Sequence, residues 1–331
     1  MNFNLGEQYN FLEENEILNN NIALLCYGGS HAYGTNIATS DVDIRGIASL
    51  MRDNVILCND FETFVETTTD TTIYSLNKII HLLTNANPNV IEMLGCKDEH
   101  YIYLNDIGKL LLQHKHLFLS KKCIHSFGGY SHAQLMRLKN NLARYNMTQP
   151  EKQEHIKTSM LSAASLFEKQ YPKYNSSCLS IYTDKPDKNQ EETEIYADVT
   201  LKRFPVKDFK SMINEIANVQ KQYEKTNHRN KKKDDLHLNK HMMHLIRLYI
   251  MCIDILVNED IVTYREKEHD LLMDIRNGVF LKDGNVTKEF WDMLDYYKEK
   301  FKHAAAHTKL PDEPNKKEID KLLIDMYEMV L

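Results

Sequence analysis

The order of hydrophobic and polar positions predicts strands in the first part of the chain. An apolar run from Ile22 to Tyr27 stops at two consecutive glycines, which is typical of a buried strand. The segment from Asp41 to Leu50 alternates polar with apolar residues, as a half-buried strand does. A third strand is predicted over 61–68 from its β-branched content.

Helical periodicity takes over after these strands. Apolar residues at 76, 79, 80 and 83 have the i, i+3, i+4, i+7 spacing of an amphipathic helix, predicted over 74–83, with a short second helix over 90–94 after the Asn87–Pro88 turn. Further helices are predicted over 110–119, 131–145, 151–171 and 239–257, and the less regular stretch 173–203 has room for a strand over 196–204. The pattern predicts an α+β protein with a small mixed sheet and flanking helices over 1–115. A mainly helical part over 116–331 follows, with a less regular insertion around 173–235.

Charge restricts the possible partners. The 331 residues carry 41 Lys and Arg against 47 Asp and Glu, a net charge of −6, which excludes a protein that coats nucleic acid by bulk electrostatics. Residues 201–240 run against this trend, with a local balance of +6. This segment is either a nucleic-acid contact surface or a solvated loop.

The cysteines and the N-terminus indicate a cytoplasmic protein. The six cysteines are far apart, without metal-binding spacing, so we expect reduced thiols, with no zinc site and no disulfide. The first sixteen residues carry four acids and no apolar core, and no window reaches the roughly 20 apolar residues of a membrane span. We therefore expect neither a secretory signal nor a membrane partner.

The chemistry is concentrated between Gly28 and Gly46. A Gly-Gly-Ser turn that leaves a strand lets the backbone come close to a ligand, and its amides with the Ser30 hydroxyl can hold phosphate oxygens. Ser30 is also a candidate N-cap for a helix that starts near residue 31.

Two carboxylates follow this turn in the next predicted strand. Asp41 and Asp43 are two residues apart, so a strand would place both on one face, where they repel each other unless a cation is bound. Hard oxygen ligands of this kind suit Mg²⁺ or Mn²⁺ together with substrate phosphates. A phosphate-binding turn beside metal-binding carboxylates is the arrangement that phosphoryl transfer needs.

Gly29-Ser30, ten residues, then Asp41-Val-Asp43-Ile44 resembles the signature of the DNA polymerase β-like nucleotidyltransferases. The longer string GSHAYGTN..TSDVDIRG is similar to one branch, the RlaP-like nucleotidyltransferases associated with RNA repair, which includes phage members. Further segments match in order, up to Leu310-Pro-Asp-Glu-Pro314, but the central region from 151 to 235 does not.

The resemblance implies three acidic metal ligands and catalytic residues. Asp41 and Asp43 occupy two of these positions, and Asp70 best fits the third, with Glu62 and Glu66 as competitors. Asp70 would complete the site and help to activate the acceptor.

Basic residues are candidates for nucleotide binding. Arg45 follows the predicted metal strand, and it either contacts phosphate or forms a structural ion pair. Lys78 lies on the next predicted helix. It either reaches the phosphate or is an ordinary solvent-exposed lysine. A third group shares one face of the helix over 239–257, either in a cleft or in solvent, and consists of Lys240, His244 and Arg247.

The expected reaction is metal-dependent transfer of a nucleoside monophosphate from an NTP to an acceptor hydroxyl, with release of pyrophosphate. The resemblance implies an RNA 3′ end as acceptor. Two alternatives remain open: transfer to a protein or small molecule, and a non-catalytic nucleotide- or RNA-binding module in phage–host conflict. The carboxylate pair disfavours the module, because a binding module has no need for a repulsive metal pair.

Overall fold

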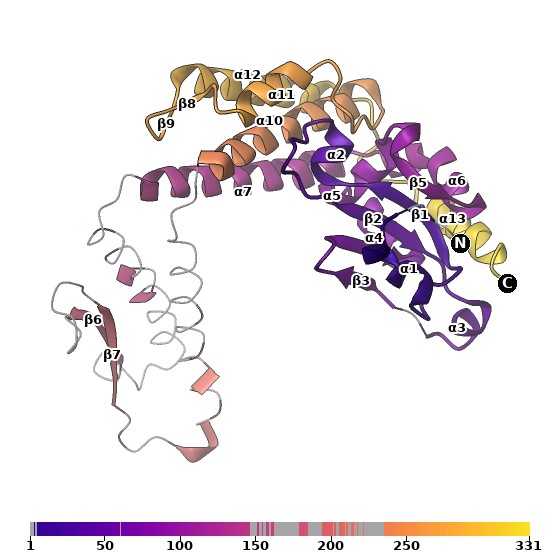
Figure 1. Ribbon diagram of the computed structural model, residues 1–331, viewed down its shortest axis with the longest axis horizontal. Helices are drawn as coiled ribbons and strands as arrows, with labels where there is room; N and C mark the ends of the chain where they lie inside the picture. Colours follow the sequence, from indigo (N-terminus) through magenta and orange to yellow (C-terminus); the bar gives the residue numbers. More distant parts are fainter. Residues whose placement is uncertain are drawn as a thin grey trace. The chain divides into compact units, whose positions relative to one another are not determined.

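The computed structural model describes residues 3, 5–59, 61–145 and 235–331, together with scattered positions between 151 and 221 (Figure 1). The chain forms two compact units. Residues 1–138 and 235–331 make the first, and residues 139–234 make the second. The boundary predicted at residue 115 separates a catalytic domain from a helical region, whereas these two units are defined by compactness alone. The predicted boundary therefore stays a prediction.

A five-stranded mixed sheet lies at the centre of the first unit, with strand order β3-β4-β2-β1-β5. Only β2 and β4 pair in parallel, and the other neighbours are antiparallel. The strands are β1 (Ile22–Tyr27), β2 (Ile44–Ala48), β3 (Thr63–Glu66), β4 (Thr71–Ser75) and β5 (Tyr101–Leu104).

Both faces of the sheet are buried, which explains the unbroken apolar run of β1. On one face Ala23, Leu24 and Cys26 join a large core with the helices, whereas Ile22 and Leu25 face a smaller core formed with the N-terminal segment. The shorter elements of this half are Glu7–Tyr9 (3₁₀), α1 (Phe11–Glu14), α2 (Gly29–Tyr33), α3 (Arg52–Ile56), α5 (Pro88–Ile91), and the 3₁₀ turns Glu92–Gly95, Asp98–His100 and Lys115–Phe118. The longer helices are α4 (Leu76–Thr84), α6 (Asp106–Gln113) and α7 (Lys122–Tyr145).

The C-terminal helices complete the same core. Leu248, Met251 and Leu322 are buried in one cluster with β1 residues. The helices are α10 (Asp235–Asn258), α11 (His269–Arg276), α12 (Lys288–His307) and α13 (Lys316–Glu328), with a two-stranded ribbon of β8 (Leu281–Lys282) and β9 (Asn285–Val286). These elements confirm the predicted α+β class with a helical region after the sheet.

Helix α10 is unusually apolar for its length. Within the described residues, Leu236–Asn258 has the length and composition of a membrane span, contrary to the expectation that no segment does. However, 67% of its most apolar window is buried inside the protein, and a core helix meets the same criteria. The helix is therefore only weak evidence for a span.

The second unit contains one described antiparallel ribbon, formed by β6 (Leu179–Asp184) and β7 (Glu194–Val199), and a 3₁₀ turn at Val206–Asp208. The ribbon overlaps the strand predicted over 196–204. Most of the helix predicted over 151–171 and most of the basic stretch 201–240 lie outside the described residues.

Several element boundaries differ from those predicted. β2 begins at Ile44 rather than Asp41, and β4 and β5 were not predicted. The predicted helix at Tyr74 begins instead at Leu76, because Ser75 is its N-cap and accepts a hydrogen bond from the Lys78 amide at 3.2 Å. The segment 110–119 is divided between α6 and a 3₁₀ turn.

Candidate active site

The register of the sheet brings two acidic residues to one edge. β2 and β4 are parallel with Ile44 opposite Thr71, so Asp43 and Asp70, one position earlier on each strand, are neighbours. The Ile44 amide donates to the Asp70 carbonyl at 3.3 Å. The Gly28 amide donates to the Asp43 carbonyl at 2.8 Å, which places the glycine turn on the other side of Asp43.

The two carboxyl groups affect each other's ionisation. When Asp43 is protonated, its carboxyl group can donate a hydrogen bond to the Asp70 carboxylate. Burial, and then the hydrogen bond and negative charge of Asp70, raise the pKa of Asp43 to about 7. The hydrogen bond from Asp43 lowers the pKa of Asp70, and Arg45 and Lys240 lower it further. The pair therefore carries less than its full negative charge near neutral pH.

The glycines allow the turn to approach Asp43. Gly29 has φ +53°, and a Cβ atom at this position would lie 1.7 Å from Asp43 Oδ2. A Cβ at Gly28 would lie 3.0 Å from Arg45 Cγ. Only glycine at position 29 permits this close approach to the carboxylate.

Helix α2 begins directly in this turn, and its N-cap lies two residues earlier than predicted. Gly28 is the N-cap and Gly29 the first helical residue, so Ser30 lies inside the first turn and is not the cap. The prediction of a Ser30 cap was wrong because the glycine itself adopts the cap conformation.

Arg45 forms the ion-pair contacts that were one of its two predicted interpretations. Its Nη1 donates to the Asp70 carbonyl at 2.7 Å and to the Ile44 carbonyl at 3.0 Å. Its Nη2 lies 3.5 Å from Asp70 Oδ1 and 4.0 Å from Asp43 Oδ1. The guanidinium thus holds the carboxyl pair in place and partly compensates its charge.

Asp41 does not share this arrangement. It precedes β2 in an irregular, exposed segment, so the strand alternation that would align it with Asp43 does not apply. Among the described residues, no three His, Cys, Asp or Glu side chains are close enough to hold a metal ion together. Asp43 and Asp70 alone fit a hard divalent cation, because a cation would replace the proton that they share.

Lys78 and Lys240 have different surroundings. Lys78 Nζ binds Glu62 Oε2 at 2.7 Å in an exposed ion pair. Lys240, at the start of α10, is exposed and forms no ion pair with any described residue, and its charge lowers the pKa of both Asp43 and Asp70. Of the two lysines, Lys240 is the one whose charge acts on the carboxyl pair.

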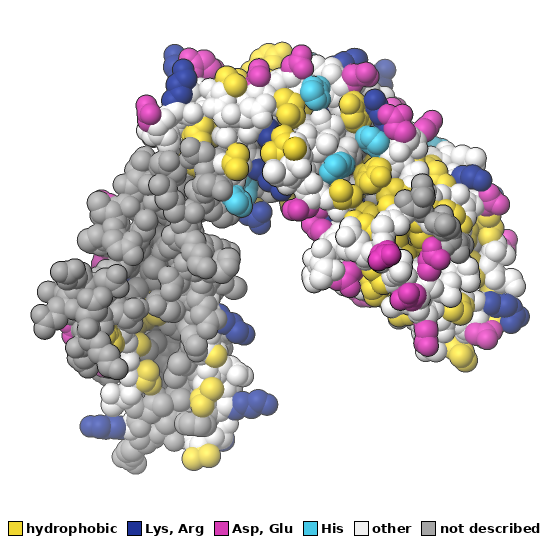
Figure 2. Space-filling model, viewed as in Figure 1, with side chains coloured by type: hydrophobic (Ala, Val, Ile, Leu, Met, Phe, Trp, Pro, Cys, Tyr) yellow, Lys and Arg dark blue, Asp and Glu magenta, His cyan; other side chains and the backbone are white. Residues whose placement is uncertain are grey.

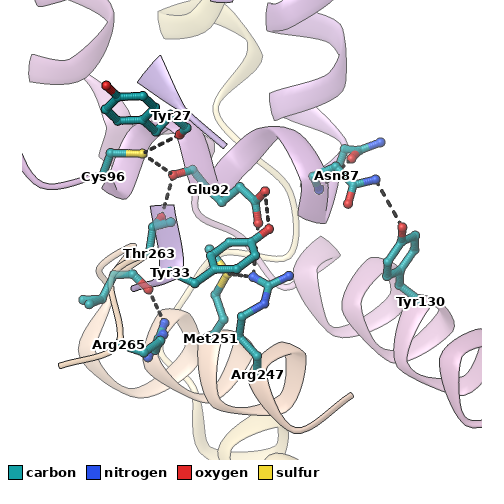
Figure 3. A network of polar contacts seen from close by, with 12 residues as sticks. Tyr27, Tyr33, Asn87, Glu92, Cys96, Tyr130, Arg247, Met251, Thr263 and Arg265 are labelled. Atoms are coloured by element: carbon teal, nitrogen blue, oxygen red, sulfur yellow. Dashed lines mark hydrogen bonds and ion pairs between the residues drawn. The ribbon is translucent and has the colours of Figure 1, made fainter. Parts of the chain in front are cut away.

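Arg247 is the centre of a buried network (Figure 3). Its Nη1 lies 3.2 Å from Glu92 Oε2, and its guanidinium lies 3.6 Å from the centre of the Tyr33 ring. The Tyr33 hydroxyl donates to Glu92 Oε1 at 2.7 Å. Since all three side chains are buried, Arg247 fixes helix α2, which carries the glycine turn, against α10.

The segment after α10 extends this network. Thr263 Oγ1 donates to the Glu92 carbonyl at 2.6 Å, and the Arg265 amide donates to the Tyr33 carbonyl at 3.1 Å. The Arg265 guanidinium is paired with Asp254. Helix α2 is therefore held by side-chain and backbone contacts from one C-terminal segment.

His244 lies partly buried on α10 between Lys240 and Arg247. Its ring meets Tyr33 edge-on, with 6.3 Å between ring centres. Burial, and then the positive charges around it, hold the pKa of His244 well below its usual value. The imidazole is therefore neutral near pH 7.

Sequence reasoning assigned no role to Glu92 or Arg276, and it left Tyr33 either to stack on a base or to pack. Glu92 is 59 residues from Tyr33 and 155 from Arg247, so no local pattern reveals their contact. The one available signal was chemical: a glutamate in an otherwise apolar segment requires a partner if it is buried.

A mixed sheet with a glycine turn and paired carboxyl groups at one edge is the arrangement that the resemblance to nucleotidyltransferases predicts. Residues 7–160 match the family described as RlaP, the RNA repair pathway DNA polymerase beta family. Over this range the match confirms the resemblance to the polymerase β-like nucleotidyltransferases of the RlaP-like branch that was found in the sequence. The match includes the glycine turn and all three predicted acids, and it ends before α10. No curated protein and no solved structure gave a match.

Proposed function

We propose that the protein transfers a nucleoside monophosphate from an NTP to the hydroxyl group of an acceptor, with release of pyrophosphate. The observation that carries this proposal is the Asp43–Asp70 pair, packed against Gly28 and Gly29 at the start of α2. Proton sharing between two adjacent carboxyl groups is what a divalent cation site looks like before a cation neutralises it.

Asp43 and Asp70 would hold Mg²⁺ or Mn²⁺, and Asp41 remains a predicted third ligand. The bound cation supplies charge stabilisation for the triphosphate and lowers the pKa of the acceptor hydroxyl. Arg45 keeps Asp70 oriented through its contacts with the carbonyl and the carboxylate.

The remaining steps belong to residues of the chain. Gly29 and Ser30 hold the triphosphate so that the α-phosphorus faces the acceptor. The acceptor oxygen forms a bond to this phosphorus while the bond to the β-phosphate oxygen breaks, and pyrophosphate leaves with that electron pair. Asp70, whose lowered pKa keeps its carboxylate ionised near neutral pH, accepts the hydroxyl proton.

We propose the 3′ hydroxyl of RNA as the acceptor. The support comes from the description of the matched family, which places its members in an RNA repair pathway. The net charge of −6 requires that any RNA contact be local. On the face shown in Figure 2, acidic and basic side chains are interspersed over the upper helices, so the described part of this face shows no extended basic surface.

The test is incubation of the purified chain with each α-³²P-labelled NTP, Mg²⁺ or Mn²⁺, and a pool of RNA with free 3′ ends. We expect label on RNA with the wild type and at least a 100-fold lower rate with Asp43→Asn or Asp70→Asn. Asp53→Asn, which changes an exposed carboxylate on α3, is the matched control and should retain the wild-type rate.

The distribution of the label decides the outcome. Label on protein or on a small molecule would retain the reaction and overturn the RNA acceptor. Unchanged transfer by both Asp43→Asn and Asp70→Asn would show that the site is elsewhere.

A further inference from the structure

Four of the five described cysteines form two pairs of neighbouring thiols. Cys26 on β1 lies next to Cys96, which directly follows the 3₁₀ turn Glu92–Gly95, and Cys123 on α7 lies next to Cys252 on α10. In each pair the two thiol groups are close enough to hydrogen-bond with each other. A disulfide requires two cysteine side chains in such proximity, so each pair has the arrangement from which a disulfide forms.

The two pairs differ in their access to solvent. Cys96 is half-buried and lines a surface cavity of about 350 Å³ together with Tyr264 and the end of α10. Its neighbour Cys26 is fully buried, and in the second pair Cys123 and Cys252 are only 1% and 0% exposed. A peroxide molecule is hardly larger than water, so a cavity of this size admits it to Cys96, whereas the second pair is closed to it.

Cys96 contacts two parts of the chain that position the glycine turn (Figure 3). Its Sγ lies 3.9 Å from the Tyr27 carbonyl oxygen and 3.5 Å from the Glu92 carbonyl oxygen, and its single S–H hydrogen can be donated to either. Tyr27 is the last residue of β1 and directly precedes the glycine turn, and the Glu92 carboxylate accepts from Tyr33 of α2. The thiol therefore contacts both the strand that leads into the turn and the acid that binds α2.

The residue before Cys96 is packed tightly against the segment that follows α10. A Cβ atom at Gly95 would overlap the Ile261 carbonyl group, and the Thr263 amide donates to the Gly95 carbonyl at 3.0 Å. The same segment holds α2 through the bond from the Arg265 amide to the Tyr33 carbonyl. Strand β1, by contrast, is paired with a strand on each side. A displacement of Cys96 would therefore move the segment that holds α2 more readily than it would move β1.

We propose that Cys26 and Cys96 are a reversible oxidation site, at which hydrogen peroxide converts the two thiols to a disulfide and thereby slows nucleotidyl transfer. One peroxide oxygen is transferred to the Cys96 sulfur, which becomes a sulfenic acid, and the other leaves as water. The Cys26 sulfur then bonds to the Cys96 sulfur, and the sulfenic oxygen leaves as a second water with the Cys26 proton. The two thiols thus lose two electrons, which reduce the peroxide. The slower transfer rests on the proposed function, whereas the disulfide does not.

The disulfide would disturb the glycine turn for two reasons. Its sulfur atoms are about 2 Å apart, closer than those of thiols that only hydrogen-bond, so Cys96 is pulled toward β1. Oxidation also removes the S–H donor that Cys96 offers to the Tyr27 and Glu92 carbonyl groups. A misplacement of about 1 Å in a catalytic site costs on the order of 100-fold in rate, so we expect transfer to slow by about tenfold or more.

The test of the disulfide is peptide mapping of the full chain after oxidation. Reduced protein is treated with hydrogen peroxide, unfolded in the presence of an alkylating reagent and digested without reductant. We expect mass spectrometry to show a linked Cys26–Cys96 peptide, while Cys123 and Cys252 are recovered in alkylated form. Treatment with dithiothreitol before unfolding should return Cys26 and Cys96 to the alkylated form, because a dithiol reduces the disulfide by exchange.

Cys26→Ala and Cys96→Ser should each abolish the linked peptide, and Cys58→Ser, which changes an exposed cysteine, is the matched control that should retain it. Cys96→Ser changes a half-buried position, so it tests the inference even if Cys26→Ala is unstable. Recovery of alkylated Cys26 and Cys96 after peroxide treatment would overturn the inference, and so would a sulfinic or sulfonic acid at Cys96 without a link. A Cys123–Cys252 link that forms at the same rate would also overturn it, because oxidation would then follow unfolding.

The effect on transfer is measured with labelled NTP on the same oxidised protein. We expect the rate to fall by about tenfold or more, to recover with dithiothreitol, and to stay unchanged in peroxide-treated Cys96→Ser. A linked chain that transfers as fast as the reduced chain would overturn the effect on the turn. If no acceptor receives label but the linked peptide forms, the proposed transfer fails and the oxidation site stands. If label is transferred and no linked peptide forms, the transfer stands and this inference fails.

Discussion

Asp43 and Asp70 occupy adjacent positions on parallel strands, and burial together with the Asp70 carboxylate raises the pKa of Asp43 to about 7. Arg45 compensates part of their charge, and the Gly29 backbone excludes other groups from one side of Asp43. At the scale of single residues, the site is therefore a pair of acidic side chains. The surrounding protein opposes the ionisation of Asp43, and a bound cation would favour it.

The first prediction concerns Asp43→Asn. An amide donates to Asp70 as protonated Asp43 does, but it cannot ionise, so the variant should fold normally and lose the rise in melting temperature that Mn²⁺ gives the wild type. The folded-state pKa of about 7 exceeds the unfolded value near 3.9, so the stabilisation from Asp43 is full below about pH 4 and lost as the pH rises through 7.

Relative to the wild type, Asp43→Asn should accordingly gain stability between pH 5 and pH 8, by about 2 to 3 kcal/mol in metal-free buffer. Urea unfolding at both pH values measures this gain, with Asp53→Asn as control. A variant that keeps the full Mn²⁺ shift would remove Asp43 from the metal site.

A second residue-scale prediction concerns His244. Its folded-state pKa is far below the unfolded value of about 6.5, so the folded state keeps the ring neutral while the unfolded chain takes up a proton. This stabilisation is complete above pH 6.5 and declines as the pH falls. Between pH 7 and pH 5 the wild type should lose about 1 to 2 kcal/mol that His244→Gln does not lose. Urea unfolding measures the difference, and the exposed His132→Gln should behave as the wild type; equal pH dependence in His244→Gln would contradict the prediction.

At the scale of elements, the buried Tyr33–Glu92–Arg247 network joins helix α2 to α10 through the 3₁₀ turn that begins at Glu92. A buried ion pair is a poor source of stability compared with an apolar contact, because both charges lose water. It does, however, fix the relative position of the two elements, because each buried charge is compensated only when it faces the other. The network therefore fixes where the glycine turn lies relative to the helix that carries Lys240.

The third prediction follows from the coupling of these charges. Arg247→Met leaves a buried carboxylate without its counter-charge and should destabilise the protein by about 3 kcal/mol. In the double variant with Glu92→Gln, the neutral amide still accepts from Tyr33, so much of this loss should be recovered. Urea unfolding of a double-mutant cycle measures the coupling energy. The exposed Asp106–Lys109 pair, cycled as Asp106→Asn and Lys109→Met, should show a coupling near zero. Additive losses at Glu92 and Arg247 would contradict the prediction.

The sequence predicts elements well where one physical rule decides them. β1 was predicted because its apolar run is buried on both sides, and α4 because its apolar stripe has helical spacing. β4 was missed because its inward positions are the buried polar residues Thr71 and Ser75 with Ile73, a pattern that does not read as an apolar face. The extension of β2 back to Asp41 was wrong because alternation continues into a segment that pairs with no strand.

The candidate site divides in the same way. The sequence predicts Asp43 and the glycine turn because they are close along the chain, and Asp70 through family resemblance. It does not predict the proton shared with Asp70, which depends on the parallel register, or the partner of Arg247, which lies 155 residues away. Long-range pairing is thus the information that local patterns lack.

At the scale of the whole molecule, the first compact unit is assembled from two distant stretches of chain. Its main core combines β1 and α4 with residues of α10 and α13, and no described residue of 139–234 belongs to that core. The Gln134 Oε1 and His241 Nδ1 atoms are 3.2 Å apart, so the unit-one part of α7 ends close to the start of α10. A short connection can therefore bridge the two stretches.

The last prediction is that residues 139–234 can be replaced by a short Gly-Ser linker without loss of the fold. A few flexible residues span the gap between neighbouring helices, and the deletion removes no side chain of the main core. We expect cooperative thermal unfolding within a few degrees of the wild type, measured by circular dichroism, and a monodisperse peak in gel filtration. A chain that ends at residue 138 is the control: it lacks the α10 and α13 side chains that cover the sheet, and it should expose apolar surface and aggregate. A well-folded 1–138 fragment, or an unfolded linker variant, would show that the two stretches do not share one cooperative core.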